Sequence, residues 1–448
     1  MADNLNMTRG NPGKLLLRFS LPLMFANVFQ QLYTVVDTAI VGQGVGMTAL
    51  AALGTVDWLN WMFTGIAQGY GQGFSVRIAQ KFGQGDLKGM RRVVGISAVL
   101  CVFIAAVFML LGQGLLPLFL HWMKVPENLQ SMATLYMRIM LAGFPCVMFF
   151  NYCSATLRAV GNSKTPLIAM IIASFVNIGL DLLAVYVWGW GIAGAAMATV
   201  CSQTLAGGIC AWKIWKTKEL HFTKKDMVPD RGLCKDLLLI GSPVAAKNTI
   251  IALGGMVVQT VVNTFSLSFI AGFTATNKLY GLLEIAATSY GYAVTTYVGQ
   301  NYGAMKLDRV KTGMRAATWL AIATSLVIAT VMLVFGRSIT GIFISAENAA
   351  LASRACDIAY WYLCAMSVSL PILYLLYVYQ AGLQGMGNTV VPMVSGMLEF
   401  VLRVSLSSVV AYSGFQYGIF GAEVSAWWGA AIFLMFSYFR CYKKNSKK

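Results

Sequence analysis

The chain has 448 residues, of which 58% are hydrophobic and only 11% are charged, and its mean hydropathy is +0.68. Because a soluble domain carries about 25% charged residues, this composition excludes an ordinary soluble protein and indicates a protein that crosses a membrane many times. The formal net charge of +17 is also compatible with a nucleic-acid partner, but the positions of the basic residues explain it differently.

Apolar runs of about 20–30 residues recur along the chain without strand-like alternation. In lipid, every backbone polar group must be hydrogen-bonded within its own segment or in a closed barrel. The runs therefore predict an all-α polytopic membrane protein with twelve transmembrane helices. In chain order, they cover residues 15–42, 50–81, 91–118, 131–159, 164–188, 190–213, 237–265, 269–301, 313–336, 354–384, 389–413 and 415–440.

A polar, basic connector at residues 214–236 divides the twelve spans into two sets of six. We expect an N-terminal lobe in residues 1–213, a cytoplasmic linker at 214–236, and a C-terminal lobe with a basic tail in 237–448. Each half holds an even number of spans, so both halves insert with the same orientation, as in a parallel repeat.

The basic residues lie almost entirely on one side of the membrane. With the N-terminus inside, about 26 Lys and Arg fall in inner segments, and only Lys124, Arg337 and Arg354 fall outside. This bias predicts a multi-pass protein of the cell's inner (plasma) membrane with both termini in the cytoplasm. It also explains the net charge without nucleic acid.

Cysteine and histidine offer little chemistry here. The nine Cys are scattered, mostly within apolar spans, and the two His lie far apart in connectors. No CxxC or Cys/His cluster is present, so we expect no bound cofactor, no transition-metal site and no enzyme activity.

An internal repeat relates the two halves. Gln80 to Gly83 correspond to Gln300 to Gly303 at an offset of 220 residues. The longest set shares an offset of 226 and pairs Tyr136, Pro145, Gly161, Asn162, Pro166 and Tyr186 with Tyr362, Pro371, Gly387, Asn388, Pro392 and Tyr412. The repeat predicts two six-helix lobes related by a pseudo-two-fold axis along the membrane normal, with a substrate path between them.

Several acids lie inside the expected spans, where ionisable groups are costly and often functional. Glu399 has Arg403 four residues on, on the same helix face, so we expect a structural pair. Glu284 has no such neighbour, and both a structural and a functional role remain open. Asp57 and Glu423 lie near enough to span ends to reach water, which favours structural roles.

Asp37 and Asp181 differ because neither has a base within two helical turns. At 1.5 Å per residue, Asp37 lies roughly 30 Å above the start of its span and Asp181 roughly 22 Å above the start of its own. Asn177 lies one turn below Asp181, and Thr199 comes to a similar depth in the next span. These four side chains predict an ion-coupling site for H⁺ or Na⁺, because burial favours protonation of a carboxylate and oxygen ligands suit Na⁺.

The second half lacks these groups. At the offset of 226, Arg403 replaces Asn177 and Ser407 replaces Asp181, and Asp37 falls opposite Val257 or Val258. The sequence therefore predicts that ion coupling belongs to the N-terminal half alone.

The chain is rich in Met and aromatic residues, which suit a soft surface for varied apolar cations. Most single aromatic residues pack in cores or face lipid. The residues that we expect to line a substrate cavity, with Glu284 as the acid among them, are Tyr33, Trp58, Trp61, Met62, Tyr280 and Glu284.

These features together resemble the multidrug and toxic compound extrusion family over nearly the whole chain, about residues 10 to 440. The resemblance is carried by Pro22 with Asp37-Thr-Ala-Ile-Val-Gly42, Leu50-Ala-Ala-Leu-Gly54, Gln80 to Gly83, Arg158-Ala-Val-Gly-Asn162 with Pro166, Asn177 with Asp181, and Gly299-Gln-Asn-Tyr-Gly-Ala304.

The resemblance implies two six-helix lobes around a central cavity and export of cationic or amphipathic compounds, driven by entry of H⁺ or Na⁺. Asp37, Asn177, Asp181 and Thr199 match the N-lobe ion site of the DinF-like branch, named after a DNA-damage-inducible member. The norfloxacin-exporter branch instead uses acids in spans seven and eight, where this chain has only Glu284. We expect a monomer in the bilayer with small-molecule substrates.

Four other functions fit less well. A lipid-linked precursor or polysaccharide flippase of the same superfamily is the main alternative, but it calls for more intramembrane bases. A major-facilitator transporter would need a different spacing in the loop after span two. A membrane enzyme would need a nucleophile or metal beside Asp37 and Asp181, and a passive channel would not need a coupled pair of acids.

Overall fold

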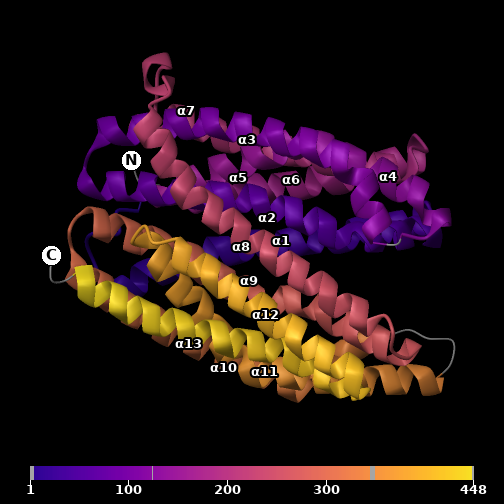
Figure 1. The fold of residues 1–448 in the computed structure, drawn as a ribbon. Coiled ribbons are helices and arrows are strands. Elements are labelled where there is room, and N and C mark those ends of the chain that lie inside the picture. Colours follow the sequence, from indigo (N-terminus) through magenta and orange to yellow (C-terminus); the bar gives the residue numbers. More distant parts are fainter. Residues whose placement is uncertain (1–4, 124, 344–348, 446–448) are drawn as a thin grey trace. The chain divides into compact units, whose positions relative to one another are not determined.

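The computed structural model describes residues 5–123, 125–343 and 349–445, and within these residues all regular structure is helical (Figure 1). The helices are α1 (Pro12–Gly44), α2 (Met47–Gln84), α3 (Leu87–Trp122), α4 (Glu127–Ala142), α5 (Phe144–Ala159), α6 (Lys164–Leu182), α7 (Gly191–Lys216), α8 (Arg231–Val262), α9 (Leu267–Gly303), α10 (Leu307–Phe343), α11 (Ala349–Gly385), α12 (Val390–Ser413) and α13 (Phe420–Asn445).

Each of the twelve expected spans corresponds to a helix or a bent pair of helices. Nine helices in the described part of the chain are long and apolar enough to cross a membrane, and α4 with α5, bent by 46° at Gly143, makes a tenth. The remaining two are α2 and α9, which exceed 35 residues but carry more polar side chains. Since α2 and α9 are equivalent in the repeat, both halves combine five apolar spans with one more polar span.

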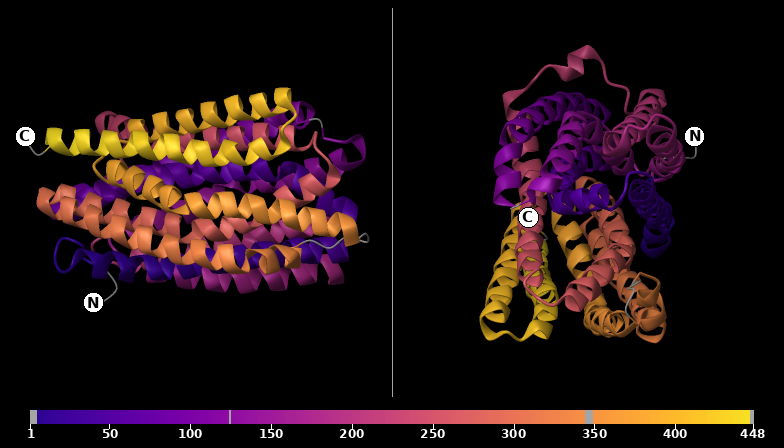
Figure 2. Two further views of the ribbon diagram at one scale, coloured as in Figure 1. Left: turned by 90° about the horizontal axis from the view of Figure 1, so that it is seen from below. Right: turned by 90° about the vertical axis from the view of Figure 1, so that its right-hand side faces the viewer.

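The chain divides into two compact units, which we describe separately. Unit 1 contains Met1–Arg9, Leu21–Thr249 and Gly299–Met305, and unit 2 contains Gly10–Ser20, Ile250–Val298 and Lys306–Lys448. Helices α1, α8 and α9 therefore each contribute residues to both units. Figure 2 shows the helices from two further directions.

In unit 1, α2 packs against α4 and α5, and α7 packs against α5 and α6. The C-terminal ends of α2 and α9 cross within this unit at two glycines. A Cβ atom on Gly83 would lie 1.9 Å from the Gln300 carbonyl oxygen, and one on Gly303 would lie 2.0 Å from that of Gln80. Only glycine fits such a backbone crossing, which explains why both copies of the Gln-x-x-Gly turn end in it.

In unit 2, α10 packs along α11, and α13 packs against α11 and α12. Aromatic rings fill its interior. Tyr362 stacks on Phe273, with ring centroids 4.8 Å apart, and on Phe420, 4.7 Å apart. Outward-facing apolar side chains such as Trp361 and Phe436 are 63% and 68% exposed, as expected for helices that face lipid.

The repeated Gly-Asn turn has the same conformation in both halves. Gly161 and Gly387 have φ angles of 87° and 86°, a left-handed conformation that favours glycine. In both copies the following asparagine begins a helix. The Asn162 Oδ1 accepts from the Thr165 N–H at 3.0 Å, and the Asn388 Oδ1 accepts from the Val391 N–H at 3.3 Å. This turn places α6 in unit 1 and α12 in unit 2.

Candidate functional site

Asn177 and Asp181 lie on the inward face of α6, with no side-chain surface exposed. They are one helical turn apart, as their spacing predicts. The helix changes character directly after Asp181, because residues Leu183–Val187 form a π-helical turn. Such turns occur often at functional sites, but the sequence gives no signal for this one.

Among the residues that the structure describes, none lies within hydrogen-bonding distance of the polar side-chain atoms of Asn177 and Asp181. Both side-chain atoms of Asn177 and both carboxylate oxygens of Asp181 are buried and unsatisfied. Leaving one buried polar group unpaired costs about 1–3 kcal/mol. Four such atoms on adjacent turns are unusual in a folded chain, which makes this cluster a candidate site for an exchangeable ion or proton.

Asp37 approaches this pair from α1. Its carboxylate interacts electrostatically with Asp181 and with Asp57 of α2, and its Oδ1 atom is buried without a hydrogen bond. Asp37 is half-buried and Asp57 is exposed. The structure thus brings together the two acids that the sequence singled out, from helices more than 100 residues apart in the chain.

Two tyrosines surround the acids. Tyr33, one turn before Asp37, and Tyr136 of α4 are 9% and 8% exposed, and both interact electrostatically with Asp37 and Asp181. Gln203 of α7 donates from Nε2 to the Tyr33 hydroxyl at 3.4 Å. No local pattern points to Tyr136 or Gln203 as members of this site, because both come from other helices.

Thr199 lies on α7, one turn before Gln203, and is half-buried. Among the described residues, no hydrogen bond joins its hydroxyl to Asp37 or Asp181. Of the four expected ligands, Asp37 and Asp181 therefore interact with each other, and Asn177 lies one turn from Asp181. The Thr199 hydroxyl is not hydrogen-bonded to either acid in the described part of the chain.

Of the expected cavity residues in unit 1, Trp58 and Trp61 meet edge to face on α2, with ring centroids 6.0 Å apart. Trp61 is 45% exposed, whereas Met62 is 7% exposed and packs inward. Tyr33, as described above, belongs with the acids. The two tryptophans thus present a contiguous aromatic surface.

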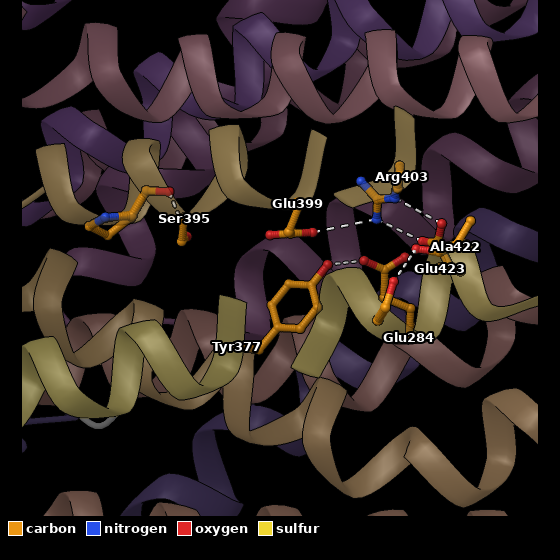
Figure 3. Close-up of polar contacts among 9 residues, drawn as sticks. Glu284, Tyr377, Ser395, Glu399, Arg403, Ala422 and Glu423 are labelled. Carbon is orange, nitrogen blue, oxygen red and sulfur yellow. Dashed lines mark hydrogen bonds and ion pairs between the residues drawn. The ribbon is translucent and has the colours of Figure 1, made fainter. Parts of the chain in front are cut away.

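Unit 2 carries a second polar cluster, centred on Arg403 of α12 (Figure 3). The guanidinium binds Glu423 of α13 at two points, with Nε–Oε2 and Nη2–Oε1 distances of 2.8 and 2.7 Å. Glu399 also contacts it at 3.4 Å, which confirms the expected pair but makes it the weaker one. Glu423 has the structural role that we expected, because it is held by Arg403, and its side chain stays 16% exposed.

The remaining unit 2 residues adjoin this cluster. Tyr377 of α11 donates a hydrogen bond to Glu284 of α9, and Figure 3 shows the two side chains pointing toward each other. Tyr280 stacks on Trp427 at 5.7 Å and interacts electrostatically with Glu284, Glu423 and Arg403. One face of the Tyr280 ring is therefore covered by the lobe itself.

Comparison with known proteins agrees with this architecture. The MatE family model matches residues 22–183 and residues 243–409, one stretch in each half of the repeat. The chain is similar to the probable multidrug resistance protein YpnP of Bacillus subtilis, at 29% identity over 344 residues covering 77% of each chain. It is also similar to the probable multidrug resistance protein NorM of Thermotoga maritima, at 25% identity over 419 residues covering 92% of this chain and 88% of the relative.

Solved structures give the fold. A crystal structure of MATE in complex with MaL6 aligns over 100% of both chains with a TM-score of 0.92 and 23% sequence identity. This match gives the twelve helices in two six-helix lobes that the repeat predicts. Because the family model covers well over half of the sequence, the chain is a multi-pass membrane protein of the MatE family.

Proposed function

We propose that this protein is a secondary active antiporter that exports cationic or amphipathic drugs and toxic organic compounds in exchange for H⁺ or Na⁺. The observation that carries the proposal is the buried pair Asn177 and Asp181, whose side-chain polar atoms find no hydrogen-bond partner at bonding distance among the described residues, with Asp37 as an interacting acid beside them. The names of the relatives, which include several multidrug resistance proteins, support the same class of substrate.

The coupling ion acts by changing the charge of this cluster. Two interacting carboxylates in a low-dielectric site repel each other, and burial disfavours the charged form of each. A proton on one carboxylate, or a Na⁺ between the carboxylate and amide oxygens, removes that repulsion. Loading and release of the ion therefore favour different arrangements of α1 relative to α6, as alternating access requires.

We place coupling in the N-terminal lobe because the equivalent position in the C-terminal lobe already holds a cation. Arg403 is the repeat equivalent of Asn177, and its guanidinium is bound by Glu423 and Glu399. A covalently attached cation cannot exchange with the solution. The C-terminal lobe therefore repeats the helices of the ion site but carries a fixed positive charge where the N-terminal lobe would bind an exchangeable ion.

The same pair weakens the case for a flippase of lipid-linked precursors. Such a substrate carries a pyrophosphate group, which needs available basic side chains. Arg403 is 3% exposed and is engaged by two carboxylates, so it does not offer its charge to an anion. No observation favours this alternative.

We further propose that the protein lies in the cell's inner (plasma) membrane as a monomer with both termini in the cytoplasm. The distribution of Lys and Arg supports this orientation. Small-molecule substrates and the bilayer are its expected partners.

Growth of a drug-sensitive bacterial host tests the proposal. Asp37→Asn and Asp181→Asn should each be expressed at the wild-type level and fail to protect the host from a cationic dye or drug. Asp57→Asn is the matched control, because it removes an exposed acid near the cluster without removing a buried one. Full protection by both Asp37→Asn and Asp181→Asn would remove the coupling hypothesis.

A further inference from the structure

A basic pocket lies where the linker between α7 and α8 meets the beginning of α3. The linker includes a short 3-10 helix, Lys224–Met227, which packs against α3. The pocket has a volume of about 480 Å³. Its lining consists of Lys88, Gly89, Arg91, Arg92, His221, Thr223 and Asp226, all of which belong to unit 1.

The pocket carries an excess of positive charge. Three cationic side chains face a single carboxylate, that of Asp226. This carboxylate is already engaged, because its Oδ2 accepts from both the backbone N–H and the hydroxyl of Thr223 at 2.8 Å. Arg92 is bound outside the pocket by Asp230 at 2.9 Å, in an exposed pair that contributes little. Asp226 interacts electrostatically with Arg91 and Arg92, and with Asp230 beside Arg92 the three cations of the pocket still exceed the nearby carboxylates, chiefly through Lys88.

Arg91 is held in place without being neutralised. Its Nη2 donates to the Lys218 carbonyl oxygen at 2.8 Å, and its Nε donates to that of Glu219 at 3.3 Å. Carbonyl acceptors orient a guanidinium but leave its full charge available. Lys88, one turn away on α3, is exposed and forms no ion pair within the described residues.

Residues around the pocket mark the level of lipid headgroups. Trp212 and Trp215, near the end of α7, are 55% and 66% exposed, and the Lys216 ammonium lies 4.1 Å from the ring centre of Trp212. Exposed tryptophans with a lysine beside them are typical of the membrane–water interface. On the α3 side, a run without charged residues begins at Val93, directly after Arg92.

We propose that this pocket binds the phosphodiester headgroup of an anionic membrane lipid such as phosphatidylglycerol. Arg91 and Lys88 donate to the phosphate oxygens, and the uncharged part of α3 that follows Arg92 and the end of α7 accommodate the acyl chains. Basic pockets beside transmembrane helices on the cytoplasmic side suit such headgroups. A free phosphate would satisfy the same charges, but it would make no use of the surrounding apolar surface.

Lipid titration of the purified full-length protein tests the proposal. The protein in a neutral maltoside detergent is titrated with phosphatidylglycerol or phosphatidylcholine, and the bound lipids are counted by native mass spectrometry. The test variant is Lys88→Gln with Arg91→Gln. The matched control is Lys224→Gln with Lys225→Gln, which removes two exposed charges from the same linker outside the pocket lining.

The wild type should bind phosphatidylglycerol in preference to phosphatidylcholine. Since each basic residue near the surface contributes about fivefold to binding, the test variant should lose roughly 25-fold of its affinity, and the control should lose much less. The single variant Lys88→Gln, whose side chain holds no part of the linker, should lose about fivefold. The single variant Lys88→Gln keeps the test valid if replacement of Arg91 loosens the linker.

Three results would overturn the proposal. Equal losses in the test and control variants would show that binding follows the total charge of the linker. Equal affinity for the two lipids would exclude recognition of an anionic headgroup. Displacement of the lipid by millimolar inorganic phosphate, with the same sensitivity to Lys88→Gln, would identify a site for a soluble anion.

Discussion

Replacement of Asn177 by leucine separates a functional side chain from a structural one. Asn177 is fully buried, and neither its Oδ1 nor its Nδ2 has a hydrogen-bond partner in the part of the chain that the structure describes. Leucine has a similar volume and leaves no polar atom unsatisfied. If each unpaired atom costs about 1–3 kcal/mol, Asn177→Leu should raise the free energy of unfolding by at least about 2 kcal/mol. The same change should abolish transport, because it removes a ligand of the proposed ion site.

The assay compares the thermal unfolding of the purified variants in detergent. For a cooperative unit of the size of unit 1, about 1 kcal/mol corresponds to roughly 2–4 °C in Tm. Asn388→Leu is the matched control, since the same substitution directly before α12 removes an Oδ1 that accepts from the Val391 N–H at 3.3 Å, and the native side chain has no unsatisfied buried atom. The control should lose about 1 kcal/mol. A loss of stability in Asn177→Leu as well would refute the reasoning and make Asn177 a structural residue.

Three further predictions concern stability. Arg403→Gln should lower the free energy of unfolding by about 3–5 kcal/mol, because it leaves Glu399 and Glu423 without their buried partner. Arg337→Gln, in the exposed pair with Asp357, should lower it by about 1 kcal/mol or less. Equal losses in urea or thermal unfolding would contradict the burial of the first pair. Gly83→Ala should destabilise the protein by at least about 2 kcal/mol, because the added Cβ would clash with the Gln300 carbonyl oxygen. Gly208→Ala should be neutral or stabilising, because its Cβ would meet no atom within 4 Å. A neutral Gly83→Ala would mean that α2 and α9 can move apart where they cross. The hydrogen bonds from Lys81 and the Gly89 N–H lower the pKa of Asp86. Its contribution to stability is therefore present above the unfolded pKa of about 3.9 and is lost as the pH falls through the lower folded value. Asp86→Asn should reduce this acid dependence of Tm, and an unchanged dependence of Tm on pH would contradict the role of Asp86 as the cap of α3.

Much of the fold follows from the sequence because hydropathy and repeat offsets are properties of the chain itself. Apolar runs find helices wherever a span faces lipid. They are weakest for α2 and α9, where Asp57 and Glu284 lie among other polar residues. Both helices are nevertheless predicted by apolar runs at residues 50–81 and 269–301, and the matching Gln80 and Gln300 segments lie near their ends.

The site was harder to predict, for a physical reason. Helical spacing reports neighbours on the same helix, so it placed Asn177 beside Asp181 and Arg403 beside Glu399. It says nothing about partners on other helices. The two-point contact of Arg403 with Glu423 joins α12 to α13, and the hydrogen bond from Gln203 to Tyr33 joins α7 to α1. Such contacts depend on tertiary packing, which no local pattern encodes.

Efflux from proteoliposomes tests the central claim most directly. A fluorescent cation is loaded, a pH gradient and a Na⁺ gradient are imposed separately, and the wild type is compared with Asp37→Asn, Asp181→Asn and Glu284→Gln. Coupling in the N-terminal lobe predicts that at least one of the two gradients drives efflux by the wild type, that neither does so in the two Asp variants, and that Glu284→Gln retains gradient-driven efflux. Gradient-driven efflux that survives in both Asp variants and is lost in Glu284→Gln would contradict the account and place the coupling ion in the C-terminal lobe.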